Sequence, residues 1–270
     1  MKSLLVYASE DTAFDSRLGA AIDMARAFEA HLTCLQVTPF DPFLFGDAFG
    51  GAYAFPTIIE EMRRAEEAHR ARIEARLGRE GISWDWRHCN GQPAKMVVRH
   101  SPLADLIVLS LARRDGRVTG APPSLTADVA VHARSPVLAV PTDSKAFDCL
   151  GPALVAWNGS SEAAHALRFA LPMLERAAAV HIVTIVEDVI DFPSIDPCEY
   201  LARHGIGAEL HEWPLQGRTV AEAICDAVPA FGAKYVVMGA YGHTRAREAV
   251  LGGATRNMLD KSEVPLLLGH

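Results

Sequence analysis

The same succession of segments occurs twice in this chain, and this repeat constrains its fold more than any other feature. Leu4–Val37 and Ala153–Val186 each contain a short apolar segment, a polar turn, a helical pattern and a second apolar segment, and they begin 149 positions apart. Later, Asp105–Ser110 matches Lys234–Gly239 at a spacing of 129 positions. The repeat predicts two copies of one architecture, and the smaller second spacing places an insertion in the first copy.

The apolar segments are short, rich in Val, Ile and Leu, and alternate with amphipathic helical patterns. This alternation is typical of βαβ units, in which a parallel sheet is covered on both faces, and right-handed crossovers then give a doubly wound α/β fold. We predict domains at residues 1–141 and 152–270, joined by a polar linker over 142–151. The predicted strands are 3–8, 31–37, 82–87, 105–110 and 136–140 in the first domain, and 153–157, 180–186, 207–213, 235–239 and 264–268 in the second.

The insertion combines an aromatic loop with a helix. Pro39–Pro56 contains five of the eleven Phe residues of the chain. Thr57–Leu77 has apolar residues at helical spacing, which predicts an amphipathic helix, and the mixed charges of Glu60–Arg79 predict a solvated face. Two interpretations of the loop stay open: a flap packed over its own domain, or an apolar surface for another subunit or an apolar ligand.

Glycines follow the predicted strand 235–239 at the carboxyl end of a sheet, where open α/β folds bind ligands. Glycine lets the backbone approach a ligand closely, and the free N–H groups at the start of the next helix suit phosphate oxygens. The spacing matches neither the dinucleotide fingerprint nor the P-loop. The residues predicted to contact phosphate are Gly239, Gly242, His243, Arg245, Gly252, Gly253, Ala254 and Thr255.

Together with the repeat, these residues make the chain resemble a tandem member of the universal stress protein family. Nucleotide-binding members carry G-x-x-G-x₉-G-[ST] here; Gly239, Gly242 and Gly252 match it, while Gly253 replaces the Ser or Thr. Asn158 aligns with the Asp that meets adenine in the family. The resemblance implies a Rossmann-like strand order of 3-2-1-4-5 in each domain and two fifth strands paired in a pseudo-dimer. Asn158 is therefore expected to meet adenine, and Gly159, Ser160 and Val183 are further residues expected to bind the nucleotide.

The first copy departs from this pattern. Ser110 and Arg113 stand where the second copy has Gly239 and Gly242, so side chains would crowd a phosphate. Pro122 and Pro123 stiffen the following loop. We therefore predict that the first domain lacks the nucleotide site.

The function that the resemblance implies is a stress-response protein that binds an adenine nucleotide, ATP with or without Mg²⁺, and acts as a regulatory binding module. Two alternatives stay open. One is a slow ATPase at the same loop, although no catalytic base or Walker-type Asp stands out, and no catalytic residue is predicted. The other is a nucleotide-free interaction protein, or a sensor of an apolar ligand, that uses the aromatic loop.

Composition narrows the partners. The net charge of −7 does not favour binding to nucleic acid. The five cysteines are scattered without a C-x-x-C pair, so neither a disulfide framework nor a cysteine zinc site is expected. We predict no metal site, and we expect His181 to be structural. Without a secretory leader or a long apolar stretch, we expect a cytoplasmic protein without membrane insertion, which forms a homo-oligomer and has a protein partner that the sequence does not identify.

Overall fold

A computed structural model describes residues 1–39, 55–111, 124–186, 195–241 and 253–270. The elements of the first half are β1 (Ser3–Tyr7), α1 (Phe14–Phe28), β2 (His31–Thr38), α2 (Phe55–Leu77), β3 (Trp84–Asn90), α3 (Pro93–His100), β4 (Leu106–Ser110), α4 (Leu125–His132) and β5 (Val137–Val140). Those of the second half are β6 (Ala153–Ala156), α5 (Ser161–Leu174), β7 (Val180–Val186), α6 (Asp196–Arg203), β8 (Glu209–Pro214), α7 (Val220–Ala230), β9 (Tyr235–Gly239), α9 (Ala254–Lys261) and β10 (Leu266–Gly269).

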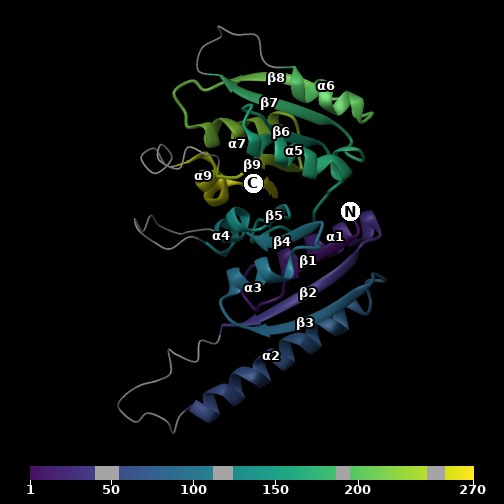
Figure 1. Ribbon diagram of the computed structural model, residues 1–270, viewed down its shortest axis with the longest axis vertical. Helices are drawn as coiled ribbons and strands as arrows, with labels where there is room; N and C mark the ends of the chain where they lie inside the picture. Colours follow the sequence, from purple (N-terminus) through teal and green to yellow (C-terminus); the bar gives the residue numbers. More distant parts are fainter. Residues whose placement is uncertain (40–54, 112–123, 187–194, 242–252) are drawn as a thin grey trace.

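The strands form a single sheet with the order β3-β2-β1-β4-β5-β10-β9-β6-β7-β8 (Figure 1). Within each half, neighbouring strands are parallel. This confirms the predicted order of 3-2-1-4-5 in the first half. The fifth strands of the halves are antiparallel, with Leu138 opposite Leu267, so the sheet continues from one half into the other.

Helices cover both faces of the sheet, as a doubly wound fold requires. Buried residues of α1, α2, α5 and α6 pack against one face, and those of α3, α4, α7 and α9 pack against the other. In the second half, Val155 of β6 faces the first group and Leu154 faces the second. Across the described residues, no helix combines the length and the apolar character that crossing a membrane requires.

The amphipathic helix of the insertion is present, but only its C-terminal half packs on the sheet. His69, Ile73 and Leu77 are buried, whereas Met62 is 41% exposed and Ala65 is exposed. The sequence predicts the amphipathic helix, but it does not show that the N-terminal half of the apolar stripe lies beyond the sheet. The reason is length, because 23 residues of helix span about 34 Å, whereas the seven residues of β3 span about 23 Å. Figure 1 shows α2 extending past the sheet.

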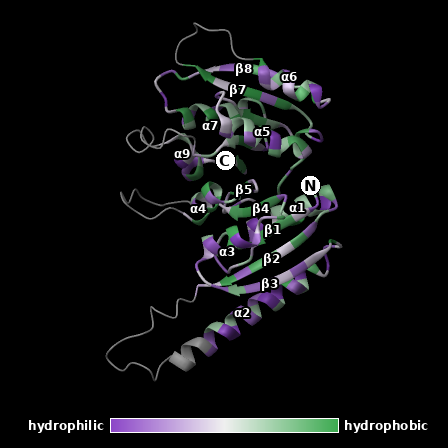
Figure 2. Ribbon diagram, viewed as in Figure 1, coloured by the Kyte–Doolittle hydropathy of each residue, from purple (hydrophilic) through white to green (hydrophobic). Residues whose placement is uncertain are grey.

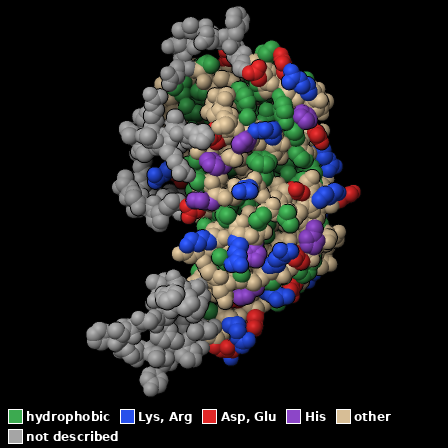
Figure 3. Space-filling model, in the orientation of Figure 1, with side chains coloured by type: hydrophobic (Ala, Val, Ile, Leu, Met, Phe, Trp, Pro, Cys, Tyr) green, Lys and Arg blue, Asp and Glu red, His purple; other side chains and the backbone are tan. Residues whose placement is uncertain are grey.

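The exposed face of α2 is charged, as predicted. Arg63 pairs with Glu60 at 2.9 Å and Arg70 pairs with Glu74 at 2.7 Å, both at helical spacing. Hydrophilic residues line the outer side of this helix in Figure 2, and basic and acidic side chains are interspersed in the lower part of Figure 3. This pattern is that of a solvated helix and not of a surface with one sign of charge.

The segment between the halves is not the polar linker that the sequence suggested. Phe147 and Cys149 are 4% and 3% exposed and belong to the core. The backbone N–H of Phe147 donates a hydrogen bond of 2.9 Å to Asp23 on α1, and its ring meets that of Tyr235 on β9 edge-on at 5.9 Å. The segment therefore packs against elements of both halves.

Candidate functional site

A pocket of about 550 Å³ opens at the carboxyl ends of β6, β7 and β9. Its size suits a small ligand. The chain leaves β6 through α5 on one face of the sheet, whereas α7, which leads into β9, covers the other face. A crevice at such a switch point is where open α/β sheets hold ligands, so the fold itself places the pocket here.

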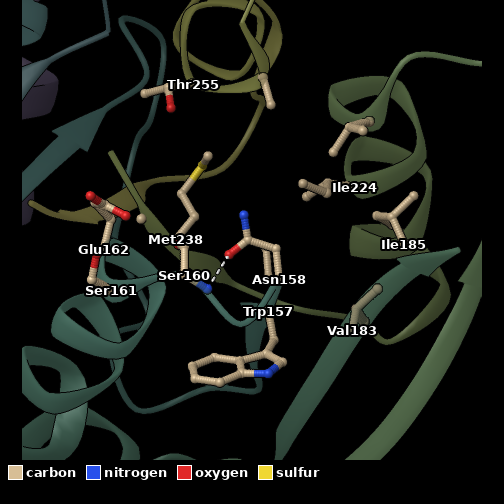
Figure 4. A pocket seen from close by; sticks show the side chains of 14 residues that line it. Trp157, Asn158, Ser160, Ser161, Glu162, Val183, Ile185, Ile224, Met238 and Thr255 are labelled. Carbon is tan, nitrogen blue, oxygen red and sulfur yellow. Dashed lines mark hydrogen bonds between the residues drawn. The ribbon is translucent and has the colours of Figure 1, made fainter. Parts of the chain in front are cut away.

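The two ends of the pocket differ in chemistry (Figure 4). Val183 and Ile185 of β7 and Ile224 of α7 form an apolar end. Ser161 and Glu162, at the start of α5, lie on the opposite side. A ligand with a flat apolar part and a polar part matches this division.

Asn158 lies between the two ends and shapes the start of α5. Its Oδ1 accepts the backbone N–H of Ser160 at 3.1 Å, and the Ser160 Oγ accepts the N–H of Ala163 at 3.1 Å, which caps the helix. Gly159 makes the turn between them with a φ of 73°, a left-handed conformation that favours glycine. The amide nitrogen of Asn158 points into the open part of the pocket (Figure 4).

Gly239 is needed for packing as well as for lining the pocket. A Cβ at this position would lie 2.6 Å from the backbone nitrogen of Ala163 and 2.7 Å from the carbonyl carbon of Glu162. Glycine therefore lets the end of β9 sit directly against α5. The sequence suggested only close approach to a phosphate, and the structure adds a reason that requires no ligand.

Thr255 is buried, and its Oγ1 accepts the backbone N–H of Tyr241 at 3.3 Å. In the first half, the corresponding Thr126 donates to the carbonyl oxygen of Ser110 at 2.6 Å. Both threonines thus fasten the start of a helix to the end of a strand. The hydroxyl that was expected to contact phosphate has this structural bond.

The helix that begins at Ala254 differs from its counterpart in the first half. There, Ser124 caps α4 by accepting the N–H of Ala127 at 3.2 Å. Gly253 holds the same place in α9, and no side chain of the described residues caps that helix. The first N–H groups of α9 therefore lack a side-chain acceptor within the described part of the chain, and Ala254 lines the pocket.

The pocket brings together half of the residues that the sequence proposed. Those lining it are Asn158, Ser160, Val183, Gly239, Ala254 and Thr255, with Gly159 and Gly253 beside them in the chain. Gly242, His243, Arg245 and Gly252 lie outside the described residues. The sequence reasoning missed Ala156, Trp157, Ser161, Glu162, Ile185, Val220, Ile224 and Met238. Alternation along β7 from Val183 to Ile185, and the i, i+4 pair Val220 and Ile224, are patterns that point to several of them.

In the first half, a protein side chain fills the corresponding strand ends. Arg17, which is 2% exposed, donates from Nε to the carbonyl oxygen of Tyr7 at 2.7 Å and from Nη1 to the Ser110 Oγ at 2.6 Å. Its Nη2 donates to the carbonyl oxygen of Ser9 at 3.1 Å and to Asp11 Oδ2 at 2.9 Å. Ser110, which stands in the place of Gly239, is thus one of the acceptors that hold the guanidinium.

Solved structures resemble this fold over nearly its whole length. A universal stress protein from Archaeoglobus fulgidus aligns over 99% of this chain and 96% of its own, with a TM-score of 0.77 and 18% identity. A protein from Pseudomonas aeruginosa UCBPP-PA14 ascribed to the same family aligns over 99% and 92%, with a TM-score of 0.58 and 16% identity. No curated protein sequence matches the chain significantly. Because the sequence pattern of the universal stress protein family matches residues 1–141, more than half of the chain, this protein belongs to that family.

Proposed function

We propose that the pocket of the second half binds an adenine nucleotide, ATP, and that the protein acts as a regulatory binding module. The observation that carries this proposal is the division of one pocket into an apolar end and an end bordered by helix N-termini. In ATP, likewise, a flat and largely apolar base is joined to a charged phosphate chain.

The start of α9 suits the phosphates. Gly253 leaves the first N–H groups of this helix without a side-chain cap among the described residues, and Ala254 faces the pocket. Unpaired N–H groups at a helix start carry partial positive charge and bind phosphate oxygens. The loop glycines would add to this anion site, as the family resemblance implies, and Arg245 would add a positive charge.

The apolar end suits the adenine ring. Val183, Ile185 and Ile224 offer aliphatic surface for its faces, and such surface makes up most of the lining of small-molecule sites. The Asn158 amide nitrogen can donate to a ring nitrogen of the base. Its Oδ1 is held by Ser160, so the amide enters the site with a fixed orientation.

Glu162 is a candidate ligand for a Mg²⁺ ion that accompanies ATP in this pocket. It is 5% exposed and is the one carboxylate among the described lining residues. Mg²⁺ binds carboxylates together with phosphates, so Glu162 and the phosphates of ATP can hold one ion between them. ATP affinity should therefore fall at least about tenfold when Mg²⁺ is chelated, and Glu162→Gln should abolish this dependence.

Ala254→Glu tests the phosphate end. A carboxylate there repels the phosphates, while an acidic residue in the first turn favours the helix, so the variant should fold. By isothermal titration calorimetry, ATP affinity should fall at least about tenfold while adenosine affinity stays unchanged. Arg168→Gln, elsewhere in the second half, makes the same change in net charge and should keep both affinities. Equal ATP affinity in wild type and Ala254→Glu would place the nucleotide elsewhere.

Slow ATP hydrolysis is a second candidate, because a buried carboxylate in the pocket can orient a water molecule. Phosphate release that persists through repurification and disappears in Glu162→Gln would support it. The absence of release over hours would leave binding as the function. The alternative based on the aromatic loop falls on residues 40–54, outside the described residues.

A further inference from the structure

Three side chains with metal-binding atoms meet on the last two strands of the sheet. His181 lies on β7, and Glu209 and His211 lie on β8, the strand at the top of Figure 1. In the register of this parallel pair, His181 is opposite Glu209 and Val183 is opposite His211. Because side chains alternate along a strand, all three point to the same face.

Their ligand atoms form a nearly regular triangle. His181 Nδ1 lies 3.2 Å from His211 Nε2 and 3.6 Å from Glu209 Oε2, and His211 Nε2 lies 3.5 Å from the same carboxylate oxygen. Zinc bonds of 2.0–2.1 Å in a tetrahedron require ligand atoms about 3.3–3.4 Å apart. The triangle can therefore receive such an ion with shifts of a few tenths of an ångström.

We propose that His181, Glu209 and His211 form a binding site for a divalent transition-metal ion, with Zn²⁺ the best match to its geometry. Two imidazoles and one carboxylate are a known zinc ligand set that leaves a fourth position for water or another ligand. Glu209 has a 72% exposed side chain, so an ion can reach the cluster from solvent.

The surroundings hold the two imidazoles in place. The ring of Phe231, the C-cap residue of α7, stacks on His181 at a centroid distance of 4.8 Å and lies 4.3 Å from His211. The end of α7 therefore lies against the cluster, and a helix C-terminus favours a cation.

The corresponding positions in the first half carry different side chains. By strand register, Thr33, Asp85 and Arg87 correspond to His181, Glu209 and His211. There, the guanidinium of Arg87 pairs with Asp85 at 3.1 Å. Among the described residues, the ion-pair partners of Glu209 are the two histidines. The carboxylate of the second half thus lacks a permanent cation in the described structure, and a metal ion would supply one.

None of the three ligands lines the pocket, although the lining residue Val183 is opposite His211 in the strand register. Val220, at the start of α7, lines the pocket, while Phe231, at the other end, packs on the cluster. The helix between them has 11 residues, which corresponds to about 16 Å. Metal binding can therefore be tested without nucleotide, and its failure would leave the proposed nucleotide site untouched.

The test is a titration of chelator-treated, reduced protein with Zn²⁺, and with Co²⁺ as a spectroscopic probe. One equivalent should bind, and Co²⁺ should show the intense visible bands of a tetrahedral site without a thiolate charge-transfer band. Glu209→Ala, which changes an exposed side chain, and His211→Gln should each weaken Zn²⁺ at least about tenfold. The matched control is His132→Gln, an exposed histidine of α4, which should bind like wild type.

Three outcomes would overturn the proposal. One is the absence of stoichiometric binding to the wild type. The second is equal affinity in wild type, Glu209→Ala and His211→Gln, which would assign the metal to scattered surface groups. The third is a thiolate band with Co²⁺, which would assign the metal to cysteines. Thermal melting of each variant checks the fold, and Glu209→Ala keeps the test valid if a histidine variant unfolds.

Discussion

Arg17 shows how one side chain can determine whether the ends of two strands are filled by the protein itself or border a pocket. A buried guanidinium must have its donors satisfied, and this one is satisfied by two backbone carbonyls, the Ser110 hydroxyl and the Asp11 carboxylate. In the second half, the matching strand ends border a pocket. We infer that Arg17 replaces a ligand in the first half.

Replacing Arg17 by Met should lower the free energy of unfolding by about 3 kcal/mol, because it leaves a set of buried hydrogen-bond acceptors without a donor. Arg64→Met on α2 removes an ion pair from a side chain that is 73% exposed and should cost less than about 0.5 kcal/mol. Urea unfolding followed by tryptophan fluorescence measures both. If Arg17→Met is as stable as Arg64→Met, the guanidinium does not hold the strand ends together.

Sequence reasoning reached some of these residues and not others. Asn158, Ser160 and Gly239 were predictable because each stands at a strand end or helix start with a recognisable motif. Arg17 and Glu162 were not, because each lies within an ordinary helix and becomes notable only when the strand packed beside it is known. His211 was missed for a related reason: only the register of β7 and β8 brings it to His181.

The helices that border the pocket are tied together by one carboxylate. Glu222 closes a capping box with Thr219 at the start of α7 and pairs with Lys261 at the end of α9 at 2.7 Å. The Lys261 ammonium and the Thr219 donors lower its pKa to about 2. The charged form of Glu222 therefore stabilises the fold above the ordinary pKa of about 4.5, and this contribution disappears as the pH falls toward 2.

Glu222→Gln should keep the capping hydrogen bonds, because Gln also closes a capping box, and should lose the ion pair. We expect its melting temperature to lie about 2 °C below that of wild type at pH 7, with the gap narrowing at pH 3. Glu199→Gln, in an exposed pair on α6, is the control. Scanning calorimetry from pH 7 to pH 3 measures this difference in melting temperature. A difference that stays constant down to pH 3 would contradict a stabilising role for the charge of Glu222.

Elements were more predictable than their packing. Each predicted strand coincides with an observed one to within three residues. The inner strands are apolar runs because they are buried on both faces, whereas the edge strands β3 and β8 are only partly buried. The segment 142–151 was misjudged because Phe147 and Cys149 lack periodicity, and only a partner such as Tyr235 shows that they are buried. The free end of α2 was missed because its apolar spacing continues where the sheet does not.

The complete chain is asymmetric despite its internal repeat. One sheet runs through both halves, joined by β5 and β10, yet the two halves carry different side chains at corresponding positions. The first half holds Arg17 where the second has a pocket, and Arg87 where the second has His211. The family resemblance predicted the shared fold, whereas these differences follow from side chains whose neighbours only the structure identifies.

The most direct test is the stoichiometry of ATP binding to the full chain, measured by isothermal titration calorimetry with Mg²⁺ present. We predict one ATP per chain, lost in Ala254→Glu and retained in Arg17→Met if that variant stays folded. Binding of two ATP molecules would contradict the assignment of a filled site to the first half. No binding by the folded wild-type protein would contradict the proposed function itself.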